Sequence, residues 1–245
     1  MRTLSALIFA AIAALAAGSA GKAPRERDVD ARSSVASSAD VERALDGVVL
    51  LVGQRPDGRT SYGAGFVVGD HGDVLTAAHV VRDVTAIGAL LRDRAQPGYT
   101  VLDGGLARVL DERAPEVVAG RVIAIDEETD LAVLCIAANT RALPRLALRA
   151  DAPSLGDRVF ALGHPGENVW SISSGVVSGH PRGSIQHDAA LGEGSSGGPL
   201  LDVNGRVVGI TTARVTAGAE RVGYARPIDS ARALLAGPGC AAGEP

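Results

Sequence analysis

Three short segments of this sequence carry a hydroxyl, an imidazole and a carboxylate in surroundings that suit catalysis. Ser196 lies in a glycine-dense turn at residues 192–200 (GEGSSGGPL), His79 follows the apolar segment 74–78 (VLTAA), and Asp130 begins another apolar run. A serine hydroxyl becomes an effective nucleophile when an imidazole takes its proton and a carboxylate orients that imidazole. The sequence therefore predicts an acyl-transfer site with Ser196 as nucleophile, His79 as base and Asp130 as orienting acid.

The glycines around Ser196 fit the same chemistry. Gly194 permits a tight turn in which its own N–H and that of Ser196 point at one oxygen, so these two residues are the predicted oxyanion hole. Gly197 and Gly198 remove side chains that would block the approach of a substrate. Ser195 competes for the nucleophile role, but only Ser196 has a glycine two positions before it and two glycines directly after it. We therefore interpret Ser195 as a bystander.

Other histidines and acids compete with His79 and Asp130, and their surroundings separate them. One histidine lies in a polar turn, one follows an apolar run and precedes proline, and two lie in polar connections; in that order they are His71, His164, His180 and His187. The acids at 126–128 form a run typical of a solvated loop, whereas Asp130 is the last acid before the apolar residues. Position therefore favours His79 and Asp130.

The order His, Asp, Ser along the chain resembles that of the trypsin-like serine peptidases. The residues around these three positions resemble the bacterial periplasmic HtrA (Deg) branch of that family. Four further segments carry this resemblance, which extends from about residue 48 to residue 235: 63–68 (GAGFVV), 162–166 (LGHPG), 174–179 (SGVVSG) and 188–191 (DAAL). The resemblance implies an all-β fold of two six-stranded antiparallel β-barrels of the trypsin-like type with a short C-terminal helix. It also implies a secreted or periplasmic serine endopeptidase that works through an acyl-enzyme, with protein or peptide substrates as its partners.

The sequence departs from the resembled proteins at three places. The HtrA branch usually carries asparagine where this chain has His164. Its members commonly continue into PDZ domains, whereas only a tail at 237–245 follows the predicted peptidase domain, so we expect a form without a PDZ domain. Ser195 stands where the digestive zymogens carry the aspartate that pairs with a new N-terminal amine, so we expect no activation of that kind.

The resemblance also suggests which residues form the S1 pocket, which receives the side chain before the cleaved bond (P1). Ala190, six positions before Ser196, is expected at its base with Leu191 beside it, Glu193 at its rim and Thr211 in its lining. An apolar base offers no partner for a buried Lys or Arg, and an unpaired buried charge is costly. We therefore expect small or medium apolar P1 residues.

Short apolar runs separated by turn residues predict the strands of these barrels independently of the resemblance. They lie at 48–52, 60–68, 74–77, 117–125, 131–136, 158–162, 171–177, 200–201 and 206–212. We expect a peptidase domain at 41–236, with barrels at about 45–142 and 150–226. Asp229 and Ser230 near its start and Gly237 beyond its end predict a closing helix within 227–235.

The N-terminal residues predict export. Residues 1–20 read as a signal peptide, because their apolar stretch at 4–17 is shorter than the about 20 residues that span a bilayer as a helix. Retention of this segment as an anchor stays open, but after cleavage we expect no stable membrane insertion. Residues 21–40 lack periodicity and are expected to be a flexible lead-in. We expect a bacterial protein that is periplasmic or extracellular.

Charge and cysteine usage narrow the other functions. The formal net charge is −4 and no basic stripe occurs, so nucleic acid is not an expected partner. No Cys/His spacing suggests zinc, and we expect neither a metal nor a cofactor. Cys135 and Cys240 could form a disulfide or be two separate thiols. The alternative function on the same fold is a peptide-binding or chaperone-like module with little turnover.

Overall fold

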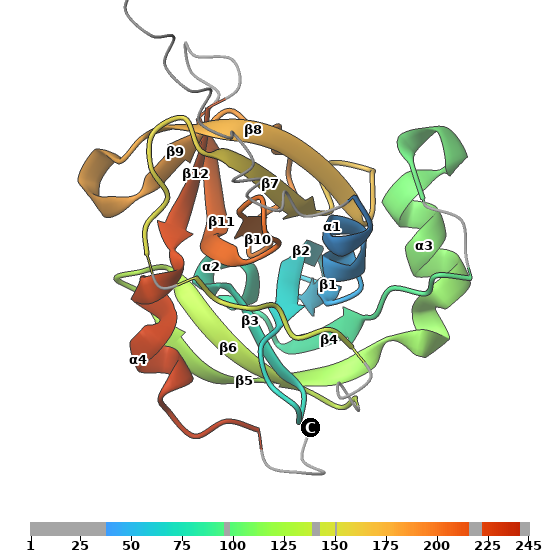
Figure 1. Cartoon of the computed structure of the whole chain (residues 1–245). Helices are drawn as coiled ribbons and strands as arrows, with labels where there is room; N and C mark the ends of the chain where they lie inside the picture. The colour runs from blue at the N-terminus through green and yellow to red at the C-terminus, as the bar shows by residue number, and fades with distance from the viewer. Residues whose placement is uncertain (1–37, 96–98, 139–142, 150, 216–221, 241–245) are drawn as a thin grey trace, which may run out of the picture. The chain divides into compact units, whose positions relative to one another are not determined.

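A computed structural model gives the structure of the chain and describes residues 38–95, 99–138, 143–149, 151–215 and 222–240. The strands form two closed barrels of six antiparallel strands each (Figure 1). The first barrel closes in the order β1-β2-β3-β6-β5-β4 and the second in the order β10-β11-β12-β9-β8-β7. This topology, together with a short helix after the second barrel, confirms the predicted fold class.

The strands are short, as barrels of this size require. The first barrel contains β1 (Val48–Gln54), β2 (Thr60–Val67), β3 (Asp73–Ala77), β4 (Ala86–Leu90), β5 (Val118–Asp126) and β6 (Leu131–Ile136). The second contains β7 (Arg158–Gly163), β8 (Ser171–Gly179), β9 (Ile185–His187), β10 (Pro199–Leu201), β11 (Val207–Val215) and β12 (Val222–Pro227).

Helices occupy the ends and connections of the barrels. The α-helices are α1 (Ser38–Leu45), α2 (Ala78–Val81), α3 (Gly105–Arg113) and α4 (Arg232–Leu235), and the 3₁₀ turns are η1 (Val101–Asp103), η2 (Ala114–Glu116), η4 (Pro181–Gly183) and η5 (Ile228–Ala231). The closing helix, expected within 227–235, is therefore present as η5 and α4. Helix α1 begins at Ser38, within the segment 21–40 that was expected to be flexible. The proposed signal peptide lies outside the described residues.

Strand β6 shows why the two barrels pack together. All of its residues are buried, and alternate side chains of a strand point to opposite faces. Ala132 and Leu134 point into the first barrel, whereas Leu131 and Val133 join the cluster between the barrels. That cluster also contains Leu162 and other side chains of the second barrel. The apolar run at 131–136 thus serves two cores at once.

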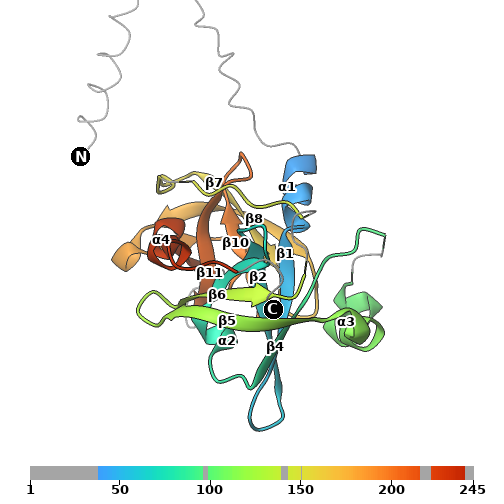
Figure 2. The ribbon, with the colours of Figure 1, turned by 90° about the horizontal axis from the view of Figure 1, so that it is seen from below.

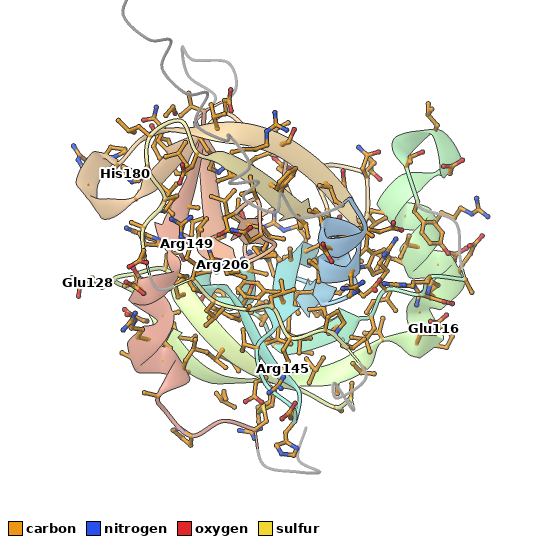
Figure 3. All side chains as sticks on the ribbon, in the orientation of Figure 1. Glu116, Glu128, Arg145, Arg149, His180 and Arg206 are labelled. Carbon is orange, nitrogen blue, oxygen red and sulfur yellow. A yellow bond between two sulfur atoms is a disulfide. The ribbon has the colours of Figure 1, made fainter. Side chains whose placement is uncertain are left out.

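The chain between the barrels is fixed by an ion-pair cluster. Asp202, at the end of β10, accepts a hydrogen bond from Arg206 at 2.8 Å and lies 3.5 Å from Arg149. Figure 3 labels both arginines, which lie near each other. The backbone N–H of Arg149 also donates to Val207 O at 2.9 Å. The crossing segment is therefore tied to the β10–β11 hairpin by charge and by backbone bonds.

After the second barrel, the chain returns to the first. Leu234 and Leu235 of α4 pack against the cluster between the barrels, and α4 lies beside β5 and β6 (Figures 1 and 2). A disulfide then joins Cys135 on β6 to Cys240 and decides the question that the sequence left open. Among the described residues, no helix is both long and apolar enough to cross a membrane.

Three strands were missed by the sequence patterns: β4, β9 and β12. The strand β9 has only three residues, and β12 contains glycine, arginine and proline, so neither sequence alternates between apolar and polar residue types. His187 was expected in a polar connection, but it ends β9 and is fully buried. The neighbouring strands, not the local sequence, recruit these segments into the barrel.

Candidate active site

His79 and Asp130 meet because they follow and precede two paired strands. β3 and β6 are antiparallel neighbours with Ala77 opposite Leu131. Ala78, which follows β3, therefore lies opposite Asp130, which precedes β6. The backbone N–H of Ala78 donates to Asp130 O at 2.9 Å, and the N–H of His79 donates to Asp130 Oδ1 at 3.0 Å. His79 Nδ1 then lies 2.7 Å from Asp130 Oδ2. The backbone pairing thus aligns the imidazole with the carboxylate.

The surroundings of Asp130 keep it ionised. Burial by itself would raise the pKa of this carboxyl, but the hydrogen bonds and charge of His79 outweigh burial and lower the pKa. The guanidinium of Arg82 adds a weaker attraction from 3.9 Å. An ionised Asp130 accepts a hydrogen bond from Nδ1–H, so the free lone pair of the ring lies on the other nitrogen, Nε2.

The turn that carries Ser196 is held against the first barrel. The backbone N–H of Ala64 donates to Ser196 O at 2.8 Å, and the N–H of Gly197 donates to Thr211 O at 2.7 Å. A Cβ on Gly197 would collide with Ala64 O and would lie 2.9 Å from Ala77 N. Only glycine allows this approach, and it brings Ser196 to the end of β3, two residues before His79.

The hydroxyl of Ser196 makes a long contact with a backbone carbonyl. Its Oγ lies 3.5 Å from Thr212 O, and within the described residues no hydrogen bond joins it to the imidazole. The structure thus joins His79 to Asp130 and brings Ser196 to the same edge of the barrels. A change of the serine rotamer is the step that would direct Oγ toward the ring.

Two N–H groups beside Ser196 are available for an oxyanion. Gly194 has a φ of 88°, and the carbonyl of Glu193 accepts a hydrogen bond from Gly166 N at 2.7 Å. In a trans peptide the N–H points opposite to the carbonyl, so the N–H of Gly194 is directed away from Gly166. In the described part of the chain, neither this N–H nor that of Ser196 has a hydrogen-bond partner.

Ser195 has a different environment from Ser196. Its side chain is buried, and its Oγ accepts a hydrogen bond from Gly192 N at 3.1 Å, while its carbonyl accepts one from Gly198 N at 3.1 Å. These bonds close the turn on itself. The geometry therefore gives Ser195 a part in shaping the loop, whereas the hydroxyl of Ser196 makes no hydrogen bond within the described turn.

A hollow of about 220 Å³ lies beside Ser196. Its described lining is formed by Leu191, Gly192, Glu193, Ser195, Ser196, Thr211 and Thr212. Ala190, expected at the base of the pocket, is not in this lining; it is exposed, and its carbonyl accepts a hydrogen bond from Ser173. Leu191 supplies apolar surface in this lining instead.

Two buried histidines lie near the site. Burial lowers the pKa of His164 and of His187 to about 4, so both rings are neutral near pH 7. A Cβ on Gly223 would lie 2.6 Å from the ring of His187 and 2.7 Å from Leu191, which places this histidine behind the pocket wall. Within the described residues, neither ring nitrogen of His187 has a partner.

Sequence reasoning missed the backbone groups that hold the serine turn. They are Ala64, Gly166 and the carbonyls of Thr211 and Thr212. The side chain of Ala64 carries no chemistry, and a backbone donor leaves no mark on residue type. Only the glycines at 63 and 65 give a local signal, because a Cβ at either position would lie 2.7 Å from a valine side chain of another segment.

A family model described as "Trypsin-like peptidase domain" matches residues 63–210. The serine protease HhoA of Synechocystis is 35% identical over 185 residues, which are 70% of this chain and 41% of that protein. A DegP-like periplasmic serine endoprotease of Chlamydia trachomatis is 34% identical over 188 residues, 72% of this chain and 33% of that protein. This chain thus spans well under half the length of these two relatives.

Solved structures agree with this similarity. The crystal structure of a serine endoprotease from Yersinia pestis aligns with a TM-score of 0.64 at 26% identity and covers 80% of this chain and 64% of that one. The HtrA-type protease AlgW with a tripeptide aligns with a TM-score of 0.66 at 28% identity, covering 81% of this chain and 62% of that one.

Proposed function

The chain belongs to the trypsin-like peptidase family, beside serine proteases of the HtrA and DegP type, and on this premise we propose that it is a serine endopeptidase. It hydrolyses peptide bonds of protein substrates with Ser196 as nucleophile, His79 as base and Asp130 as orienting acid. The observation that carries the proposal is the 2.7 Å contact between His79 Nδ1 and Asp130 Oδ2 beside the turn of Ser196.

The chemistry proceeds in two halves. Ser196 Oγ attacks the carbonyl carbon of the peptide bond while its proton passes to His79 Nε2. The negative oxygen is stabilised by the N–H groups of Gly194 and Ser196. The imidazolium gives its proton to the departing amine, which leaves an acyl-enzyme on Ser196. Water, deprotonated by His79, then releases the acid and restores the serine.

The pocket supports a preference for small or medium apolar P1 residues. Leu191 gives apolar surface, and the described lining contains one charged side chain, Glu193, which is exposed. A buried P1 carboxylate would find no cation in this described lining. Threonine hydroxyls and backbone complete the pocket.

Export is the second part of the proposal. Residues 1–20 have the composition of a signal peptide, and one relative is named as periplasmic. The disulfide between Cys135 and Cys240 supports an oxidising compartment, because such bonds persist outside the bacterial cytosol. We propose a periplasmic or extracellular location, which fractionation of cells that express the whole chain tests.

A fluorophosphonate probe tests the proposed chemistry. We expect covalent labelling at Ser196, located by mass spectrometry, together with cleavage of an unfolded protein substrate. Ser196→Ala should abolish both, whereas Ser178→Ala, which removes an exposed hydroxyl on β8, should leave both unchanged. Mapping the cleaved bonds reports the P1 preference in the same experiment. A folded protein that neither labels nor cleaves contradicts the proposal.

One observation favours the alternative of a peptide-binding module. Ser196 Oγ contacts Thr212 O at 3.5 Å and makes no hydrogen bond with the imidazole, so in this arrangement the imidazole does not activate the serine. If that arrangement persists when peptide is bound, the protein will retain peptides without cleaving them. Binding of a peptide without labelling by the probe identifies this case.

A further inference from the structure

The loop between β7 and β8, residues 164–170, contacts both the turn that carries the oxyanion hole and the first barrel. The chemistry described above uses none of its side chains. Two of them, His164 and Trp170, nevertheless make polar contacts with β1 of the first barrel, of which the one from His164 is buried and the one from Trp170 is partly buried. This loop of the second barrel therefore contacts both the oxyanion turn and β1 of the first barrel.

The backbone of His164 lies against Gly194. A Cβ on Gly194 would collide with His164 O, and the N–H of His164 donates to Gly194 O at 3.4 Å. Two residues later, Gly166 N donates to Glu193 O at 2.7 Å. Residues 164–166 thus hold the carbonyls on both sides of the Gly194 N–H, and they fix the direction of this donor.

The imidazole of His164 anchors the same loop to β1. The ring is 1% exposed, and its Nε2 lies 3.2 Å from Val49 O. The backbone N–H of Trp170 donates to its Nδ1 at 3.0 Å, so Nδ1 is the acceptor and Nε2 carries the proton. The indole N–H of Trp170 donates to Val48 O at 3.0 Å and completes the anchor.

We propose that His164 is a positioning residue for the oxyanion hole: its neutral imidazole ties the loop to β1, and the loop backbone then holds the N–H of Gly194 toward the substrate. This inference rests on the proposed peptidase function. A hydrogen-bond donor that points away from the developing oxyanion loses its effect on the transition state and hardly affects substrate binding. Loss of the His164 anchor should therefore lower kcat more than it raises KM.

The anchor requires a neutral ring. A proton on Nδ1 would face the N–H of Trp170, so two donors would meet. The charged side chains on the segments packed against His164 are Glu167 on the same loop, Glu193 on the oxyanion turn and, on α3, Arg113, whose guanidinium lies 5.6 Å from the centre of the Trp170 ring. Both glutamates are exposed. Burial lowers the pKa of His164 to about 4 and outweighs the hydrogen bond with Val49 O, which acts in the opposite direction.

The pH dependence of stability follows from this shift. Between an ordinary histidine pKa near 6.5 and the folded value of about 4, the unfolded chain binds more protons at this position than the folded chain. The contribution of neutral His164 to stability is therefore complete above pH 6.5 and falls as the pH drops toward 4.

Two substitutions at one position test the proposal. Leucine removes both ring nitrogens, whereas the amide nitrogen of glutamine reaches the position of Nε2 and can still donate to Val49 O. For His164→Leu we expect kcat to fall by about tenfold to a hundredfold with KM within about threefold of the wild type. His164→Gln should restore kcat to within about threefold. The matched control is His180→Leu, at an exposed position that Figure 3 labels, with no expected change.

An independent readout is hydrogen exchange at the amide of Gly166, which donates to Glu193 O. We expect exchange at least about tenfold faster in His164→Leu and near the wild-type rate in His164→Gln. Equal kcat and equal exchange in folded His164→Leu would overturn the proposal. If His164→Leu does not fold, the His164→Gln variant decides. A folded His164→Gln protein whose kcat falls as far as that of Ser196→Ala contradicts the proposal. If the wild type cleaves no substrate, the proposed function fails. Hydrogen exchange at Gly166 in the His164 variants still tests whether the imidazole holds this loop in place.

Discussion

His79 Nδ1 and Asp130 Oδ2 lie 2.7 Å apart although 51 residues separate them in the chain. One antiparallel strand pair produces this contact, because His79 follows β3 and Asp130 precedes β6. The backbone of each residue takes part as well, since the N–H of His79 donates to the second carboxylate oxygen. Orientation of the imidazole is therefore built into the first barrel before Ser196 is considered.

Asp130→Asn should leave the fold intact and remove activity. An amide nitrogen at this position would donate to Nδ1 and force the ring proton onto Nε2, which then cannot accept the proton of Ser196. We expect kcat to fall by about a thousandfold to ten-thousandfold, with little change in KM. Steady-state hydrolysis of a peptide that the wild type cleaves measures this loss. Glu128→Gln, a neighbouring exposed acid, should retain wild-type kcat, and equal activity of the two variants would contradict the role of Asp130.

The residues of this site were visible in the sequence to different degrees. Ser196 stands among glycines and Asp130 borders an apolar run, so residue type and context identify them. The contact with Thr212 O and the bond from Ala64 N could not be predicted, because backbone groups are common to all residues. The pocket was predicted by resemblance, and its lining differs at Ala190, which points to solvent.

Gly197→Ala should destabilise the protein and disturb the serine turn. A methyl group there would collide with Ala64 O and Thr76 Oγ1, and the φ of 85° is unfavourable for any residue with a Cβ. We expect the free energy of unfolding to fall by about 3 kcal/mol, from overpacking and backbone strain together. Urea unfolding measures this change.

Gly205→Ala is the matched control for Gly197. Gly205 has a φ of 72°, but a Cβ there meets no atom within 4 Å. The free energy of unfolding should fall by the backbone strain alone, about 1–2 kcal/mol, and activity should be retained. If both alanine variants lose the same free energy of unfolding, the close approach of Gly197 to the first barrel is not what requires glycine.

Asp202→Asn should change how stability depends on pH. Burial alone would raise the pKa of Asp202, but hydrogen bonds from Arg206 and from the backbone of Asn204 outweigh burial and lower the pKa below its ordinary 3.8. Its contribution to stability is present above pH 3.8 and is lost as the pH falls through the lower folded pKa. At pH 7 we expect the variant to be about 2 kcal/mol less stable, and the difference from the wild type should shrink at low pH.

Urea unfolding of Asp202→Asn between pH 7 and pH 2.5 measures that difference. Asp229→Asn is the control, since it removes an exposed carboxylate paired with Arg232 at 3.0 Å. Exposed pairs of this kind contribute little, so we expect no measurable change in stability. A gap between Asp202→Asn and the wild type that stays constant down to the lowest pH would contradict the assignment.

The strands that could be predicted are those in which apolar residues cover one or both faces. Residues 131–136 are apolar throughout because β6 serves two cores, and its predicted and observed bounds agree. β9 and β12 could not be predicted from local pattern, because β9 has only three residues and β12 contains glycine, arginine and proline. His187 illustrates the point, since a polar residue type gave no sign of its full burial.

The disulfide between Cys135 and Cys240 should contribute to stability and not to catalysis. It closes a sequence separation of 105 residues and ties the segment after α4 to β6, and Cys240 N also donates to Asp73 Oδ1 on the neighbouring strand β3 at 2.7 Å. Closing such a loop restricts the unfolded chain, so removing the bond should cost about 2–4 kcal/mol. The double variant Cys135→Ala, Cys240→Ala should unfold at lower urea and keep kcat within about threefold.

A reductant separates the bond from the loss of two side chains. Dithiothreitol should lower the stability of the wild type toward that of the double variant and should leave the double variant unchanged. β6 begins next to Asp130, but the disulfide lies at the other end of this strand, where Cys135 is paired with Asp73. Loss of the bond should therefore loosen that end of β6 while the pairing of Ala77 with Leu131 keeps His79 and Asp130 in contact. A large fall of kcat in a reduced protein that is still folded would show that the two ends are coupled.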